Sequence, residues 1–243
     1  MIEFKKNLNI KLCETLSGHW YKVGSKYYPS ATTILTAYPM SEHLIKWTAE
    51  QGWDEAQKIK SDAGLRGSRI HDAIEHLISG TELIRDGFAI NSTSSYSLNE
   101  WAMISQFVEW YKEVNPEVLG TEVMLFSKKH GFAGKTDLIC KINGLLTIVD
   151  YKSSAYAQPY FPLQFGAYAA ALEEMTDLKV EQTAMLQLGY KYKGVYKRRF
   201  VVYPEWQKDF QAFLKVRDVW RFDNEVDKDF VPPILDLPDT LKL

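Results

Sequence analysis

Cysteine is scarce in this sequence, whose 243 residues include only Cys13 and Cys140. Two thiols cannot build a four-cysteine zinc or iron–sulfur site. We interpret them as free thiols in a reducing cytoplasm. Cys140 falls within a run that we expect to be a strand, where any small apolar residue would serve equally well.

Long apolar runs are also missing, because no stretch approaches the ~18 residues of a membrane span. The first ten residues, MIEFKKNLNI, have neither a long apolar core nor an arginine-rich amphipathic pattern. We therefore expect no secretory or mitochondrial targeting segment. A cytoplasmic location is the prediction.

The sequence has no excess of charge of one sign, since its net charge is −2. Overall charge therefore does not indicate a nucleic-acid-binding protein, and an anionic partner must be held by a local basic patch or by a metal. Hydrophobic residues make up 46% and charged residues 25%, which is typical of a globular protein.

A chain of this length fits one large domain. We predict a single domain made of a hairpin and helical part over about 1–115, a core over about 116–222 and a tail over 223–243. A hairpin is expected within 10–28, and residues 86–99 read as a polar loop. Helices are predicted over 41–52, 54–79, 98–114, 159–175 and 205–222. Strands are predicted over 120–126, 135–142 and 145–151, and a second hairpin over 182–203 that turns near Lys193-Gly194.

The most informative stretch runs from 131 to 154 and predicts two strands joined by a tight turn. Asn143-Gly144 is a preferred two-residue hairpin loop, because both positions need positive φ. If these residues form the loop, Ile142 faces Leu145, and further along the strands Asp137 faces Asp150. Both faces of this hairpin carry apolar residues, so both must be covered. The sequence therefore predicts an α/β sandwich.

Facing acids at the far end of the hairpin indicate a cation site. Asp137 and Asp150 would repel each other unless a cation lay between them. Period two along the strand places Lys152 on the face of Asp150. Two acids and a lysine are the groups needed to hold Mg²⁺ or Mn²⁺ against a phosphate, and the carbonyl of Tyr151 offers a further oxygen. The alternative is a surface hairpin that ends in solvated charges.

These residues resemble the PD-(D/E)xK nuclease core, in the form Gly134-x-x-Asp137 followed by Asp150-Tyr151-Lys152. Three further segments are similar to the RecB-like exonuclease group, which includes phage exonucleases and a mitochondrial genome maintenance exonuclease. The segments are RGSRIHDAIEHLI (66–78), QFGAYAAAL (164–172) and YYPSATTIL (27–35), followed by Trp47. The resemblance implies a restriction-endonuclease-like core, with a mixed central β-sheet flanked by helices and an N-terminal helical subdomain.

The resemblance also implies roles for further residues. His71 is expected to be a metal ligand together with Asp137, Asp150 and Tyr151. Glu75, one turn after His71, would orient its imidazole or bind metal through water; otherwise it is a solvated helix charge. Some relatives hold an iron–sulfur cluster on four cysteines, and this chain departs from that pattern.

A second helical pair, Gln164 and Tyr168, is predicted to border the active site. By the resemblance these residues contact the DNA backbone or fix Lys152; alternatively, Tyr168 joins the apolar core of its helix. Glu122, on the preceding strand, is either a peripheral site group or an exposed strand residue.

A basic hairpin interleaved with tyrosines follows near the end of the core. Cations beside aromatic rings suit single-stranded DNA, although a solvated hairpin would look the same. Its candidate DNA-binding residues are Lys191, Lys193, Lys197, Arg198 and Arg199.

Together the motifs predict a metal-dependent DNA exonuclease that acts at DNA ends, with a preference for single strands, in recombination, replication or repair. The expected partners are DNA and a recombination or single-strand-binding protein. An endonuclease of the same fold and a non-catalytic DNA-end-binding protein are the alternatives.

Overall fold

The computed structural model describes residues 2–5, 9–15, 18–85 and 96–224. The strands are β1 (Ile10–Thr15), β2 (Gly18–Val23), β3 (Lys26–Pro29), β4 (Glu117–Ser127), β5 (Phe132–Ile142), β6 (Leu145–Lys152), β7 (Gln182–Gln187), β8 (Lys191–Tyr192), β9 (Val195–Tyr196) and β10 (Arg199–Tyr203). The helices are α1 (Ala31–Ile34), the 3-10 turn η1 (Leu35–Ala37), α2 (Glu42–Gln51), α3 (Trp53–Ile78), α4 (Leu98–Val114), α5 (Phe161–Met175) and α6 (Trp206–Asp223).

The predicted helices and the three central strands are confirmed, with ends that shift by a few residues. Residues 10–28 form a three-stranded antiparallel sheet, β1-β2-β3, where a single hairpin was expected. Over 182–203, β7 pairs with β10 and β8 pairs with β9. Residues 86–95 of the predicted loop and 225–243 of the predicted tail lie outside the described residues.

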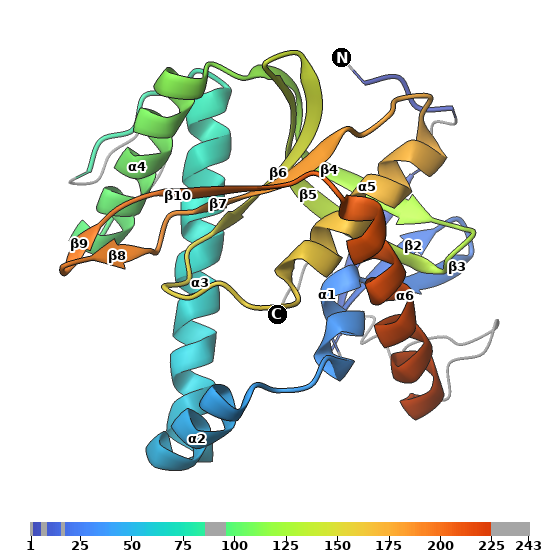
Figure 1. The fold of residues 1–243 in the computed structure, drawn as a ribbon, viewed down its shortest axis with the longest axis horizontal. Coiled ribbons are helices and arrows are strands. Elements are labelled where there is room, and N and C mark those ends of the chain that lie inside the picture. The colour runs from blue at the N-terminus through green and yellow to red at the C-terminus, as the bar shows by residue number, and fades with distance from the viewer. Residues whose placement is uncertain (1, 6–8, 16–17, 86–95, 225–243) are drawn as a thin grey trace, which may run out of the picture.

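A five-stranded mixed sheet of order β10-β7-β6-β5-β4 forms the centre of the fold (Figure 1). Its neighbouring strands are antiparallel except β6 and β7, which run parallel and are connected through α5. The predicted mixed sheet with flanking helices is therefore confirmed.

The tight turn of the central hairpin is also confirmed. Asn143 and Gly144 both have positive φ, of 52° and 84°. Ile142 pairs with Leu145, and the same register continues as far as Leu138 opposite Val149. The next residue along β5 is Asp137, and the next along β6 is Asp150, so the turn chemistry fixes where the two acids lie.

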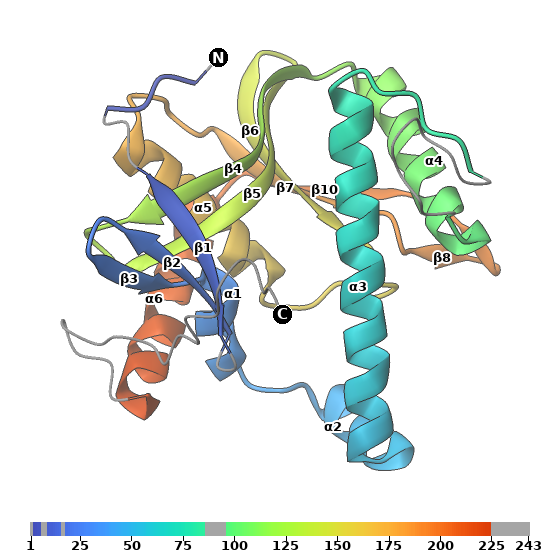
Figure 2. The same cartoon turned by 180° about the vertical axis from the view of Figure 1, so that it is seen from behind.

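Helices cover both faces of the sheet (Figures 1 and 2). On one face, Ile139 and Ile148 belong to a core shared with α1, α5 and α6. On the other, Leu138 and Val149 belong to a core shared with α3 and α4. Because alternate strand residues point to opposite faces, Asp137 and Asp150 share the face of Ile139 and Ile148.

Helix α3 is the longest helix of the described chain, and its C-terminus is well defined. Gly80, with φ of 90°, ends it in a Schellman arrangement: the N–H of Gly80 donates to Leu77 and that of Thr81 donates to His76. Arg69 binds Glu100 at 2.7 Å, and Glu100 also completes the capping box of α4. These contacts fix the C-terminal half of α3 against α4.

None of the helices in the described ranges is long and apolar enough to cross a membrane.

Helices α5 and α6 approach closely at Gly166. A Cβ placed there would lie 2.8 Å from the backbone nitrogen of Phe210 and 2.8 Å from the carbonyl oxygen of Trp206. Backbone atoms cannot move aside as a flexible side chain can, so the contact requires glycine. Gly64, within α3, has no atom within 4 Å of the same position.

We expect Gly166→Ala to destabilise the protein by about 1–3 kcal/mol through overpacking. Gly64→Ala should instead stabilise it by about 0.5–1 kcal/mol, because alanine is the better helix former at an open position. Urea unfolding of both variants measures the two shifts. Effects of the same sign would contradict the packing assigned to Gly166.

Candidate active site

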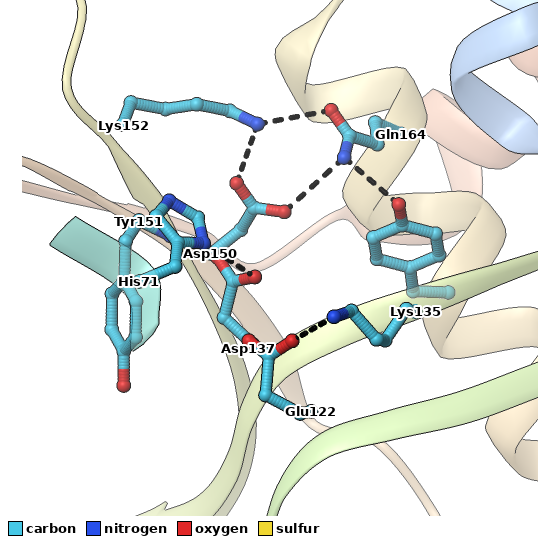
Figure 3. A network of polar contacts seen from close by, with 9 residues as sticks. His71, Glu122, Lys135, Asp137, Asp150, Tyr151, Lys152 and Gln164 are labelled. Carbon is cyan, nitrogen blue, oxygen red and sulfur yellow. Dashed lines mark hydrogen bonds and ion pairs between the residues drawn. The ribbon is translucent and has the colours of Figure 1, made fainter. Parts of the chain in front are cut away.

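The two predicted acids meet where the pairing of β5 with β6 ends. Asp137 and Asp150 are both buried, at 7% and 2% exposure. They were expected to be a facing pair of the ladder, but the register pairs end one step earlier, at Leu138 and Val149. The reason is visible in Figure 3: the Asp137 carboxylate, Oδ2, accepts the backbone N–H of Tyr151 at 2.6 Å and so takes the place of a strand carbonyl.

Asp137 also connects the sheet to α3. Its Oδ1 lies 3.2 Å from Nδ1 of His71, and the His71 ring packs edge-on against Tyr151 with centroids 5.7 Å apart. The structure therefore brings His71 to the paired acids, as the sequence predicted.

A hydrogen-bond network holds the other acid and the lysine. Lys152 Nζ lies 2.5 Å from Asp150 Oδ2 and donates to Gln164 Oε1 at 3.1 Å. The Gln164 amide nitrogen donates to Asp150 Oδ1 at 3.2 Å and to the Tyr168 hydroxyl at 2.9 Å. Of the two roles expected for Gln164 and Tyr168, the geometry favours fixing Lys152 and Asp150. Tyr168 is also buried in the apolar core. It therefore both borders the candidate site and joins the core of its helix, the two positions expected for it.

Glu122 is a third acid at the site, and it adopts an unusual backbone conformation. It lies between the pairs Thr121–Leu138 and Val123–Thr136, opposite Asp137, with φ of 50°. A left-handed conformation costs a non-glycine residue of order 1–3 kcal/mol and is concentrated at functional sites. Glu122 is half-buried and forms an ion pair with Lys135, so it lies beside His71 and Asp137 and is not an exposed strand residue.

Each of the three acids thus has its own cation. Asp137 pairs with His71, Asp150 with Lys152, and Glu122 with Lys135. Burying a carboxylate without a partner is costly. The site is therefore neutralised internally, and a bound divalent ion must compete with these cations.

The pKa values follow from this pairing. Burial lowers the pKa of His71, but the charge and hydrogen bond of Asp137 outweigh burial and raise it to about 9. For Asp137, burial raises the pKa, yet His71 and Lys152 hold it below its usual value. Burial and the charge of Asp137 raise the pKa of Asp150 to about 6, against the opposing effect of Lys152. His71 is consequently the main group that is protonated at neutral pH and must lose its proton to bind a metal.

The donor set fits a divalent cation. Ligand atoms of His71, Glu122 and Asp137 lie within 4.8 Å of one another. These three side chains are the group of potential metal ligands found among the described residues. Asp150 is not in this set, because its carboxylate is held beside Lys152. Its Oδ2 is buried and pairs with Lys152 Nζ at 2.5 Å, so a metal bound to this oxygen would share it with the lysine. Carboxylate oxygens suit hard divalent cations, and an imidazole nitrogen suits transition-metal ions, so the set fits a divalent metal without specifying which one.

The packing around Gly134 explains why the Gly134-x-x-Asp137 motif begins with glycine. A Cβ at Gly134 would lie 2.4 Å from the ring of Tyr168. The missing side chain lets Tyr168 lie against β5, where its hydroxyl reaches Gln164. Gly134 thus leaves room for Tyr168, whose hydroxyl accepts a hydrogen bond from Gln164 in the network around Lys152.

The remaining predicted residues lie at the edge of this cluster or away from it, and Glu75 is near enough to help raise the pKa of Lys135. Glu75 is exposed on α3, and the contacts of His71 are with Asp137 and Tyr151. Arg198 binds two acids of α4, Glu109 and Glu113. Its charge therefore supports the packing of the hairpin on α4, and its predicted DNA contact is disfavoured. The other four cations of that hairpin are exposed: Lys191, Lys193, Lys197 and Arg199.

Sequence reasoning missed three residues that support the site. Lys135 lies two residues before Asp137 on the same strand face, so period two could have indicated it. The Phe161 ring lies 4.6 Å, and the Phe165 ring 5.4 Å, from Nζ of Lys152. These rings stabilise the ammonium group through cation–π contacts; their spacing along α5 looked like core packing alone.

Comparison with known proteins identifies the class. The family model described as the PD-(D/E)XK nuclease superfamily matches residues 46–228. The chain belongs to this superfamily, and the resemblance inferred from its motifs is confirmed. Nucleases of this superfamily use divalent metals, in agreement with the donor set described above.

Individual relatives are more distant. The chain is 24% identical over 180 residues to human mitochondrial genome maintenance exonuclease 1. The match covers 67% of this chain but only 49% of that protein, so the chain spans about half the length of its curated relative. A candidate exonuclease from Eubacterium rectale is 14% identical, with a TM-score of 0.43 over 74% of this chain and 76% of the other. An alkaline exonuclease from Laribacter hongkongensis is 9% identical, with a TM-score of 0.36 over 82% and 92%.

At pH 7 we expect Mn²⁺ binding to release about one proton, because His71 is charged there and binds metal only when neutral. Asp150 should contribute little, since its pKa of about 6 lies below the working pH. Calorimetric titration in two buffers of different ionisation enthalpy measures the number released. His71→Gln should bind Mn²⁺ more weakly and release fewer protons. Equal proton release by both proteins would assign the proton to another group.

Proposed function

We propose that this protein is a divalent-metal-dependent DNA exonuclease that hydrolyses phosphodiester bonds at DNA ends, with a preference for single strands. The observation that carries the proposal is the cluster of three buried or half-buried acids with Lys152, at the point where the pairing of β5 with β6 ends. A binding module has little reason to hold three acids together. The human relative is named an exonuclease, and its name supports the assignment to end cleavage.

His71, Asp137 and Asp150 would hold Mg²⁺ or Mn²⁺, with the carbonyl of Tyr151 and the Glu122 carboxylate as further oxygen ligands. Such an ion, when bound, polarises a phosphoryl group and lowers the pKa of a coordinated water. Asp150 is mostly ionised at neutral pH because its pKa is about 6, so its carboxylate is available as a ligand.

Lys152 supplies the positive charge on the substrate side of the site. Its ammonium group lies between Asp150, Gln164 and the ring of Phe161. Held by these three contacts, it positions the attacking water and stabilises the charge that develops on the phosphoryl oxygens. Gln164 has the positioning role, because it fixes Asp150 and Lys152 at once.

The cellular setting we propose is DNA recombination, replication or repair in the cytoplasm of a bacterial or phage-infected cell. A recombination or single-strand-binding protein would be the natural partner. Phosphate contacts away from the cut bond would come from exposed cations of the β8–β9 hairpin and of the segment leading into β10. They are Lys191, Lys193, Lys197 and Arg199.

We expect the protein to degrade linear single-stranded DNA with Mg²⁺ or Mn²⁺ and to be inactive in EDTA. Asp150→Asn and Lys152→Ala should each lower the rate by about 100-fold or more, as loss of electrostatic stabilisation does in other enzymes. End-labelled oligonucleotides resolved by length give the rate and the polarity. Lys141→Ala is the matched control. Lys141 of β5 forms a solvent-accessible ion pair with Glu117 of β4, so activity of the variant should stay within about twofold.

Circular single-stranded DNA separates the proposal from an endonuclease, since an exonuclease leaves the circle intact. Cutting of the circle would replace the exonuclease assignment by an endonuclease. Activity that persists in EDTA, or in Lys152→Ala, would overturn the assignment of the site.

A further inference from the structure

A pocket of about 850 Å³ opens directly beside Lys152 and Gln164, which form part of its wall. One side is built by the start of α5 and the loop before it, with Tyr160 and Phe161. The other side comes from the segment between η1 and α2, which includes Tyr38, and from Lys60 of α3. The pocket is thus continuous with the candidate active site and is not used by the chemistry described above.

Two tyrosines form an aromatic surface in this pocket. Tyr38 and Tyr160 have ring centroids 5.7 Å apart at an interplanar angle of 56°, and both are half-buried. They come from segments more than a hundred residues apart, so the fold brings the rings together across the pocket. A half-buried aromatic pair of this kind offers ring faces to a planar ligand.

Charge identifies the class of ligand. The described residues that line the pocket include two lysines, Lys60 and Lys152, and no acidic side chain. The neighbouring metal cluster, in contrast, is built from acids. A planar group attached to an anionic backbone fits this combination, since bases stack on rings while phosphates bind cations.

The position of the pocket indicates which part of the substrate it would bind. Lys152 reaches both the metal cluster, through Asp150, and the pocket. A phosphate bound at Lys152 would therefore place its neighbouring nucleotide at the pocket. A volume of this size is within the range of small-molecule sites, and exceeds that of one base.

We propose that this pocket binds one unpaired nucleotide beside the phosphate that is cut, with its base stacked on Tyr38 and Tyr160 and an adjacent phosphate on Lys60. The inference rests on the proposed function, and it deepens it: a base in a duplex is stacked and paired, and must leave the helix to enter such a pocket. The pocket then supplies a physical reason for a single-strand preference.

The arrangement of α2 and α3 agrees with a strand that runs past the pocket. In both views α2 and the first half of α3 extend beyond the sheet (Figures 1 and 2), and α2 has no buried residue. Leu44 of α2 and Lys60 of α3 face the pocket from this extension. The extension therefore forms one wall of the path toward Lys152.

The test is a scan of single abasic sites across a linear single-stranded oligonucleotide. For the unmodified protein, one position beside the cut bond should lower affinity by about 5- to 150-fold, the range for one base stacked on an aromatic side chain. Tyr38→Leu and Tyr160→Leu should lower affinity for intact DNA and remove the loss at that position. The phenylalanine variants keep the ring and should retain the loss.

Two controls separate stacking from a change in folding. Phe222→Leu removes an exposed ring at the end of α6 and should leave the scan unchanged. Lys60→Ala should weaken binding at every position alike and reduce the salt slope of log K by about 0.7, the value for one phosphate of a single strand. Lys58→Ala, two residues away on α3 and exposed, should not.

The scan is read by fluorescence anisotropy with Ca²⁺ and no turnover, so it does not depend on cleavage. An abasic effect that is the same in the unmodified protein and both leucine variants would overturn the pocket assignment. A protein that shows the position-specific loss but cuts no DNA with Mg²⁺ or Mn²⁺ would instead contradict the proposed function alone.

Discussion

The buried carboxylate of Asp137 is the contact on which the rest of the site depends. One oxygen accepts the backbone N–H of Tyr151, and so joins β5 to β6 where their ladder ends. The other oxygen binds His71, and so joins the sheet to α3. A single side chain therefore determines both how the strands separate and how far the histidine helix approaches. Without these partners the charge of Asp137 would be buried and uncompensated.

The other acids extend the same principle. Lys152 forms an ion pair with Asp150, and Lys135 forms one with Glu122. These ion pairs offset the free energy of burying the carboxylates. The cations that pair with these acids would also bind the phosphate in the proposed reaction, when a metal binds the acids. The same lysines therefore stabilise the buried acids and would supply positive charge to an anionic substrate. The glutamine of α5 keeps the arrangement ordered, because it bonds Asp150 and Lys152 at the same time.

Much of this was predictable because it follows from local rules. The Asn143-Gly144 turn determines the register, the register determines the positions of Asp137 and Asp150, and the two apolar faces require helices on both sides. The positive φ of Glu122 and the cation–π contacts of Lys152 depend on how distant segments pack. The pairing of Arg198 with Glu109 and Glu113 of α4 does too, and it occupies a cation that the sequence had suggested for DNA. Tyr38 and Tyr160 likewise meet only in the folded chain.

Anomalous X-ray scattering from crystals soaked in Mn²⁺ would show whether Asp137 binds a metal, since it locates the ion without reference to activity. We expect an ion bound to the Asp137 carboxylate and ligated also by His71 and Asp150. An ion that binds elsewhere, or a site that stays empty at saturating Mn²⁺, would contradict this expectation.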